Sequence, residues 1–112
     1  MQYMALIYEA PDSVSGDADA VRSAYGALIQ EMVAAGVFIS GDELDGAETA
    51  TSVQVRGGKT KVTDGPFAET KEQLGGYLLL DCASLDDAIG WAARFPNATN
   101  GTIEIRPVMV RG

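Results

Sequence analysis

The amino-acid sequence predicts an α+β domain of ferredoxin-like type: a β-α-β unit, a β-hairpin insertion and a second β-α-β unit, all within residues 1–112. Three observations predict this fold. Strand-like and helical segments alternate in that order. The two segments that the fold places at the centre of its sheet, residues 2–8 and 76–82, are apolar on both faces, as covered strands are. The last strand carries Pro107, which cannot donate to a strand ladder and therefore suits an edge.

The first half of the chain begins with a strand at residues 2–8, followed by a loop rich in Pro, Gly and acidic residues. Apolar side chains at helical spacing predict a helix over residues 18–35. These side chains are Val21, Tyr25, Leu28, Met32 and Ala35, joined by Ala24 and Ile29. Asp17 is placed to cap the start of this helix, and Gly36 to end it in the left-handed conformation. Residues 37–41 then form a short strand.

A hairpin is predicted after an acidic connection at residues 42–50. Gly57 and Gly58 supply a two-residue turn, and the resulting register pairs Val53 with Val62. Because side chains alternate along a strand, the hairpin has two unlike faces. One face carries Val53, Val55, Thr60 and Val62, and the other carries Gln54, Arg56, Lys59 and Lys61. The basic face is either a solvated surface or a wall that attracts anions.

The second half contains a strand at residues 76–82, a helix between Ser84 and Pro96, and a last strand at residues 102–110. Ser84 is the expected N-cap, with Asp87 favourable in the first turn. The inner stripe of the helix is expected to carry Leu85, Ala88, Ile89 and Ala92. Two helices cover only one face of a four-stranded sheet and leave an apolar face bare. Because monomers seldom expose such a patch, we expect a homodimer that packs sheet against sheet.

Composition excludes several classes of function. The net charge is −8, from 8 basic and 16 acidic residues, which disfavours nucleic acid and anionic membrane as partners. No apolar run is long enough to span a membrane and no basic leader is present, so we expect a cytoplasmic protein. The absence of histidine removes Ser-His-Asp and Cys-His catalysis and histidine-bound zinc. We expect Cys82 to be a buried, inert thiol, and we expect no cofactor.

The segment VTDGPFAETKEQLGGYLLLDC concentrates charged residues next to a Gly-Pro turn. One interpretation is structural. Asp64 would form an Asx turn, and Phe67 would fill the core. Thr70 and Gln73 have the spacing of a capping box on one short helical turn, which Gly75 would end.

The other interpretation of this segment is functional. Asp64 and Glu69 could act as catalytic carboxylate bases beside a cavity, where burial raises their basicity. Lys71 could neutralise a bound carboxylate or enolate, and Tyr8, Tyr25 and Tyr77 could donate hydrogen bonds to a developing oxyanion. A metal site built from Asp42, Glu43, Asp45, Asp64 and Glu69 is a further alternative. These residues match no metal-binding loop, and we expect no metal.

The same string continues into SLDDAIGWAARFP, and the chain also contains YMALIYEAP, AAGVFISGDEL and IEIRPV. Over nearly its whole length the sequence resembles the DGPF-type branch of the YCII-related proteins. The resemblance implies a ferredoxin-like dimeric α+β barrel and a family in which most members have no established activity. Some members are encoded beside alternative sigma factors, which hints at a regulatory context. The enzymatic activity suspected in other branches rests on a histidine–carboxylate pair, which this histidine-free chain cannot supply.

From these residues and this resemblance we expect a homodimer that binds a small carbonyl-bearing or anionic metabolite. One alternative is a cofactor-free isomerase, cyclase or lyase that uses a carboxylate as general base. Another is a regulatory protein-interaction partner, for example of a sigma factor. Fold similarity alone does not decide among them. Asp64→Asn separates the first two, because lost turnover with retained binding indicates an enzyme.

Overall fold

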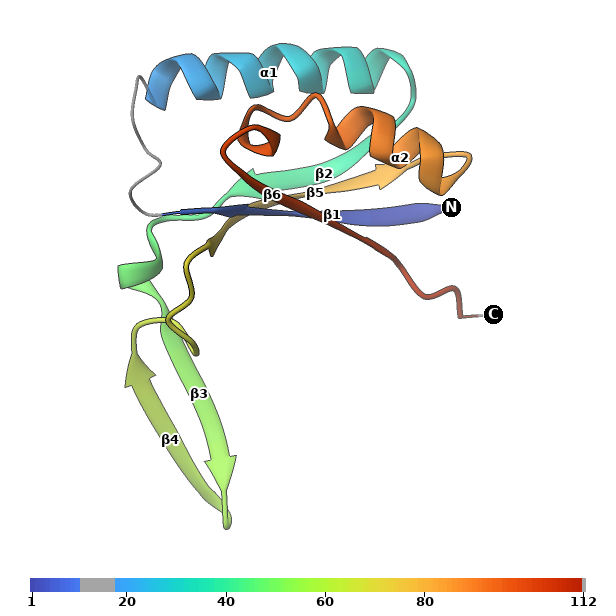
Figure 1. The fold of residues 1–112 in the computed structure, drawn as a ribbon. Coiled ribbons are helices and arrows are strands. Elements are labelled where there is room, and N and C mark those ends of the chain that lie inside the picture. The colour runs from blue at the N-terminus through green and yellow to red at the C-terminus, as the bar shows by residue number, and fades with distance from the viewer. Residues whose placement is uncertain (11–17, 112) are drawn as a thin grey trace.

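A computed structural model describes residues 1–10 and 18–111 (Figure 1). Its elements follow the predicted order and confirm an α+β, ferredoxin-like fold. Their bounds are β1 Gln2–Glu9, α1 Ala18–Ala34, β2 Phe38–Glu43, β3 Thr51–Arg56, β4 Lys59–Asp64, β5 Gln73–Asp81, α2 Leu85–Ala92 and β6 Gly101–Pro107, with 3₁₀ turns η2 at Ala47–Thr49 and η3 at Pro96–Ala98. The expected N-cap Asp17 lies outside the described residues.

The main sheet has the strand order β2-β5-β1-β6, and all its neighbouring strands are antiparallel. β1 and β5 are central, which confirms the prediction for the two strands that are apolar on both faces. β6 is an edge strand that ends at Pro107, opposite Tyr3, rather than at residue 110. Proline has no backbone N–H to donate to a neighbouring strand. Because Pro107 is the last residue of an edge strand, the sheet loses little stability from the missing hydrogen bond.

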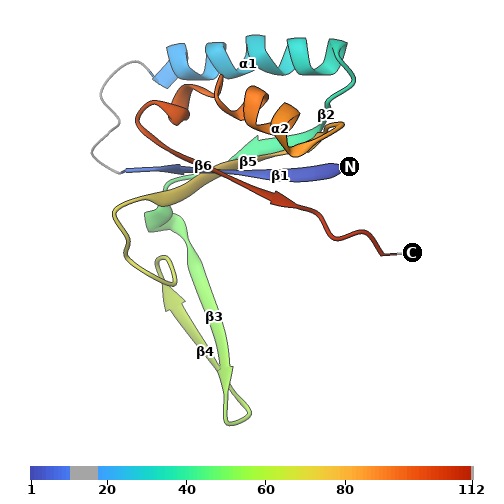
Figure 2. The ribbon, with the colours of Figure 1, turned by 45° about the vertical axis from the view of Figure 1, so that its right-hand side comes forward.

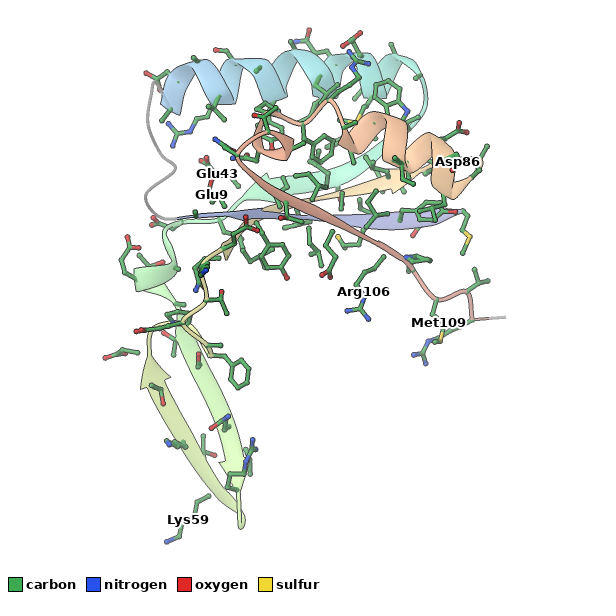
Figure 3. The ribbon with its side chains drawn as sticks, viewed as in Figure 1. Glu9, Glu43, Lys59, Asp86, Arg106 and Met109 are labelled. Atoms are coloured by element: carbon green, nitrogen blue, oxygen red, sulfur yellow. The ribbon has the colours of Figure 1, made fainter. Side chains whose placement is uncertain are left out.

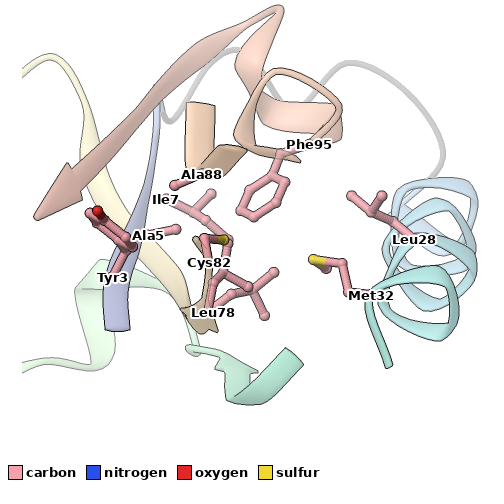
Figure 4. Packing of buried hydrophobic residues seen from close by; sticks show 10 residues of the cluster. Tyr3, Ala5, Ile7, Leu28, Met32, Leu78, Cys82, Ala88 and Phe95 are labelled. Carbon is pink, nitrogen blue, oxygen red and sulfur yellow. The ribbon is translucent and has the colours of Figure 1, made fainter. Parts of the chain in front are cut away.

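Both helices cover one face of this sheet, and the core lies between them and the sheet (Figures 1 and 4). Alternate side chains of the central strands point into this core. Its buried members are Tyr3, Ala5, Ile7, Leu78 and Leu80 from the strands, Leu28, Met32 and Ala88 from the helices, and Cys82 and Phe95 from adjoining segments. Met32 and Phe95 are 0% and 1% exposed, so they fill the space between the two layers. The opposite face of the sheet is open.

The ends of the helices follow local sequence signals. Gly36 has a φ of 73°, a left-handed conformation that confirms the expected end of α1. The Ser84 side chain caps α2 by accepting a hydrogen bond from the backbone N–H of Asp87 at 3.2 Å. α2 ends at Ala92, earlier than predicted, and Pro96 instead begins η3. Proline is favoured at such a start because its fixed φ is already helical.

The inner stripe of α2 is narrower than predicted. Ala88 and Ala92 are buried, whereas Leu85 and Ile89 are exposed. The buried residues of the helix are therefore small, with the partly buried Trp91 packed against the core beside them, whereas Leu85 and Ile89 stay exposed.

Strands β3 and β4 form a separate hairpin that projects away from the rest of the chain (Figures 1 and 2). The predicted register is confirmed, with Val53 opposite Val62. Gly57 and Gly58 have φ angles of 56° and 77°, as a two-residue turn of this kind requires. We call residues 51–64 the arm.

The loop between the arm and β5 differs from the structural prediction. Phe67 is 83% exposed and is therefore not a core residue of this chain. Thr70 and Gln73 do not build a helical turn: the Gln73 amide donates to the backbone oxygens of Ala68 and Thr70, and β5 already begins at Gln73. Gly75 consequently lies inside β5. Pairing with β1 satisfies the backbone here, whereas one isolated helical turn is costly to nucleate.

Candidate functional site

A pocket of about 320 Å³ lies between the N-terminal half of α1 and the end of the sheet at which β1 finishes. Ile7, Ile29 and Leu78 supply apolar walls. Polar side chains come from four of the elements around it: Glu9 from β1, Arg22 and Tyr25 from α1, Glu43 from β2 and Asn97 from η3. Figure 3 shows Glu9 and Glu43 below the N-terminal half of α1. An apolar cavity with a few convergent polar groups is the usual form of a small-molecule site.

Arg22 is held beside the pocket by two carboxylates. Its Nε donates to Oε1 of Glu43 at 3.1 Å, and its Nη1 lies 3.5 Å from Oδ1 of Asp19. The hydrogen bond with Glu43 raises the pKa of Arg22 above its ordinary value, so the guanidinium keeps its charge. Because the Arg22 side chain is 60% exposed, this ion pair orients the guanidinium more than it stabilises the fold.

Tyr25, Asn97 and Glu9 form a hydrogen-bonded series. The Tyr25 hydroxyl donates to Oδ1 of Asn97 at 2.7 Å, and Nδ2 of Asn97 donates to Oε2 of Glu9 at 3.3 Å. Asn97 is buried, and these partners compensate its loss of water. The ring of Tyr25 packs edge-on against Phe95, with 5.7 Å between centroids. The series therefore fixes a hydroxyl and a carboxylate in relation to each other at the pocket.

Glycines keep the sheet side of the pocket open. A Cβ at Gly41 would lie 2.5 Å from the backbone oxygen of Tyr77 and 2.3 Å from Cδ2 of Leu78. A Cβ at Gly76 would lie 3.0 Å from the backbone oxygen of Asp42. Only glycine allows the close backbone approach of β2 and β5 here, so main-chain atoms line this side of the pocket.

The Tyr25 hydroxyl is a hydrogen-bond donor at neutral pH. Burial raises the pKa of Tyr25 to about 12, and the negative charge of Glu9 acts in the same direction, whereas the backbone of Asn97 acts in the opposite direction. A protonated phenol can stabilise negative charge that develops on a ligand oxygen.

This raised pKa predicts an alkaline loss of stability that depends on Tyr25. The stabilisation of the folded chain that goes with the protonated Tyr25 is fully present below about pH 10. Between about pH 10 and 12 the unfolded chain has released this proton while the folded chain retains it, so the free energy of unfolding falls as pH rises. We expect Tyr25→Phe to flatten the decline by up to about 1 kcal/mol per pH unit, since the side chain is only half-buried. Urea denaturation across this range measures it, and parallel declines in both proteins would contradict it.

The three tyrosines that the functional interpretation groups together lie on two sides of the sheet. Tyr25 lines the pocket on the helix side. Tyr77 lies opposite Leu6 and between the buried residues Gly76 and Leu78, so its side chain points to the open face. Tyr8 also points to the open face. The sheet therefore separates Tyr8 and Tyr77 from the pocket that Tyr25 lines.

Asp64, Glu69 and Lys71 are exposed and do not line this pocket. Asp64 is the last residue of β4, and the other two lie in the loop that follows. Gly65 has a φ of 101°, and its N–H donates to the backbone oxygen of Ala50 at 2.7 Å. The Asp-Gly-Pro turn therefore fixes the base of the arm.

Two other classes of site are not formed by the described residues. Within residues 1–10 and 18–111, no three Cys, Asp or Glu side chains gather closely enough to hold a metal ion. Burial raises the pKa of the Cys82 thiol, and the charges of Asp87 and Asp81 act in the same direction, so the thiolate is disfavoured. In the same part of the chain, no helix is long and apolar enough to cross a membrane.

The sequence patterns do not reveal three polar residues of the pocket, Glu9, Arg22 and Asn97, and they name Glu43 only as a candidate metal ligand. One available signal is that Arg22 and Tyr25 are three residues apart on a helix and therefore share a side of it. Glu43 falls in the predicted acidic connection because the pattern ends that strand at residue 41, whereas β2 continues to Glu43. Asn97 lies in a short segment without periodicity, so nothing local indicates its burial.

Comparison with known proteins gives two matches. The family model of the YCII-related domain matches residues 1–110. An uncharacterized protein of Rhizobium meliloti (strain 1021) is 51% identical to this chain over 61 residues, which cover 53% of this chain and 49% of that protein. The match therefore spans about half the length of this relative, whose name assigns no activity.

Proposed function

The chain belongs to the YCII-related family, and we propose that it binds a small, neutral, carbonyl-bearing metabolite in the pocket between α1 and the sheet. The observation that carries this proposal is the convergence of the Arg22 guanidinium, which has unused N–H donors, and the Tyr25 hydroxyl on an apolar cavity. A ligand carbonyl that accepts from Tyr25 replaces Asn97 as the acceptor of its one O–H proton. Within the family we place the chain in the DGPF-type branch, on the string that begins at Asp64.

The dimensions and lining of the pocket support a small ligand. Its volume of about 320 Å³ is at the lower end of the range of about 300–1,000 Å³ for ligand sites. Ile7, Ile29 and Leu78 can cover the apolar part of a ligand. A guanidinium carries five N–H donors, more than the two contacts of Arg22 use, so a ligand carbonyl can accept from it.

The charges around the pocket favour a neutral ligand over an anionic one. Glu9 and Glu43 line the same cavity as Arg22, so two carboxylates stand against one guanidinium. Asp42 lies opposite Tyr77, so its carboxylate is on the open face and only its main chain borders the pocket. An anion would meet like charges, which disfavour its binding. A ketone, ester or lactone retains the carbonyl acceptor without this repulsion.

A fragment panel observed by ¹H–¹⁵N NMR tests the proposal. We expect small ketones, esters and lactones to shift the backbone amide resonances of Gly41 and Gly76, and carboxylates of matched size to shift them less. Tyr25→Phe should weaken binding about fivefold, since one net hydrogen bond contributes about 1 kcal/mol. Tyr77→Phe removes the same hydroxyl from the open face and is the matched control, with no expected change. Equal effects of both variants, or no shift with any carbonyl compound, would overturn the proposal.

Catalysis is a second candidate, favoured by the link of Glu9 to Tyr25 through Asn97. In a cofactor-free isomerase, cyclase or lyase, Glu9 would take the proton from the carbon next to the carbonyl. The Tyr25 hydroxyl would turn from Asn97 and donate its hydrogen bond to the carbonyl oxygen instead. The same panel in D₂O distinguishes this from binding alone: an enzyme would exchange that C–H for C–D, and Glu9→Gln would stop it. Asp64→Asn is the control, because Asp64 lies outside the pocket.

The open face of the sheet supports a further proposal, that two copies associate sheet against sheet. Its centre carries Met4, Leu6, Tyr8, Tyr77 and Leu79, which are half-buried within one chain. Polar side chains from the edge strand β6 flank this centre on one side, among them Glu104 and Arg106. An apolar centre with a polar rim is typical of an interface between subunits.

A further inference from the structure

The arm is a large element that has no place in the core of its own chain. Figures 1 and 2 show it projecting from the open side of the sheet, away from both helices. The radius of gyration is 15.9 Å, whereas a compact chain of this length has about 13 Å. The chain alone is therefore less compact than its length allows, and the arm is the reason.

The base of the arm is closed by hydrogen bonds. The N–H of Gly65 donates to the backbone oxygen of Ala50 at 2.7 Å, and the Ser52 hydroxyl donates to the backbone oxygen of Gly65 at 2.8 Å. These bonds join the start of β3 to the end of β4 and close the base of the arm next to η2. The two strands of the arm are consequently held together at the base as well as at the Gly57-Gly58 turn.

One face of the arm is apolar and exposed. Val53, Val55 and Val62 have exposed fractions of 61%, 58% and 61%. Val53 and Val62 are cross-strand partners, so the valines form one continuous surface. Because a lone two-stranded hairpin is marginally stable in water, this surface is expected to pack on something outside its own chain.

The charge of the arm is opposite to that of the rest of the chain. The arm carries Arg56, Lys59 and Lys61 against Asp64, which leaves five basic and fifteen acidic residues elsewhere. Figure 3 shows Lys59 at the tip, far from the carboxylates of its own chain that are labelled there. A second copy of this chain offers the strongly acidic surface that such an arm complements.

We propose that the arm of each chain docks on the acidic body of a second copy, with the valine face against its surface and the basic residues beside its carboxylates. This rests on the sheet-to-sheet homodimer proposed above. Each strand of the arm has six residues and is therefore about 20 Å long. Two sheets that pack face to face lie about 10 Å apart. An arm that projects from the open face is longer than this separation, so it extends past the sheet of the other copy. In a two-fold dimer the contact forms twice.

Mixed labelling tests the contact directly. A nitroxide spin label attached through Lys59→Cys marks the tip of the arm, while Cys82 is buried and stays unlabelled. This protein, without ¹⁵N, is mixed with ¹⁵N-labelled wild-type chain. We expect the label to broaden amide resonances in the body of the ¹⁵N chain, and reduction of the nitroxide to restore them.

Variants of the arm test its contribution to the dimer. We expect Lys61→Glu, and separately Val53→Thr with Val62→Thr, to raise the dimer dissociation constant about tenfold in sedimentation experiments. Lys71→Glu makes the same charge change outside the arm and is the matched control, with an expected change below about twofold. The effect of Lys61→Glu should shrink at high salt, because salt screens charge pairs.

The outcomes separate this inference from the dimer itself. A dimer with broadening in the ¹⁵N chain supports both. A dimer in which the tip label broadens nothing in the other copy, and in which arm variants match Lys71→Glu, overturns the docked arm and leaves the sheet-to-sheet dimer standing. A species of 11.7 kDa at every concentration overturns both.

Discussion

Replacing Phe95 with alanine is expected to lower the free energy of unfolding by about 3–5 kcal/mol. Phe95 is 1% exposed, and its ring packs against Tyr25 between the helices and the sheet. Alanine would lose this burial and leave a cavity that the surrounding close-packed side chains fill only in part. Because domains of this size are stable by about 5–15 kcal/mol, the change removes a large share of the total. Urea denaturation measures it.

Phe67→Ala is the matched control for this prediction. Both variants delete the same ring, but Phe67 is 83% exposed. We expect the control to change the free energy of unfolding by less than about 0.5 kcal/mol, as surface substitutions usually do. If both variants lost a similar free energy of unfolding, Phe95 would not be a core residue and the prediction would be wrong.

Replacing Gly101 with alanine is expected to cost about 1–3 kcal/mol and to disturb the pocket. The new Cβ would lie 2.1 Å from the backbone oxygen of Tyr8 and 3.2 Å from that of Asn97. Neither atom belongs to a flexible side chain, so β1 and β6 must move apart. Glu9 is the residue opposite Gly101, and its 3.3 Å contact with Asn97 should weaken. Denaturation measures the first effect, and the amide shifts caused by carbonyl fragments measure the second.

Gly90→Ala should act in the opposite direction. Gly90 lies inside α2, and a Cβ there meets no atom within 4 Å. Alanine restricts the unfolded chain and favours the helix, so we expect a gain of about 0.5–1 kcal/mol. A loss at Gly90 comparable with that at Gly101 would mean that backbone proximity is not the cause of the Gly101 effect.

The fold was largely predictable because turn residues, helix caps and proline act on the few residues next to them and so mark where its elements begin and end. The Gly57-Gly58 turn sets the register of the arm, since a two-residue turn leaves one pairing of the flanking strands. Gly36 and Ser84 mark helix ends through backbone conformation and capping, which are local effects. Pro107 indicates an edge for the same reason: its lost donor is a property of the residue itself.

The candidate site was predictable only in part. Tyr25 is the one expected ligand-binding residue that also lines the described pocket, because its helical spacing with Leu28 and Met32 places it on the side of α1 that faces the sheet. The acidic cluster near Asp64 has an obvious sequence pattern but lies at the base of the arm. Glu9 and Asn97 are far apart in the chain and carry no pattern, yet they contact each other in the fold.

The sequence by itself determined the order of the elements, the central and edge positions of the strands and the two faces of the arm. These follow from periodicity, turn residues and proline, which act within a few neighbouring residues. Only the tertiary structure decided which polar groups meet. Arg22 reaches Glu43, and Tyr25 reaches Asn97, because the packing of α1 and η3 on the end of the sheet sets distances that no local pattern encodes.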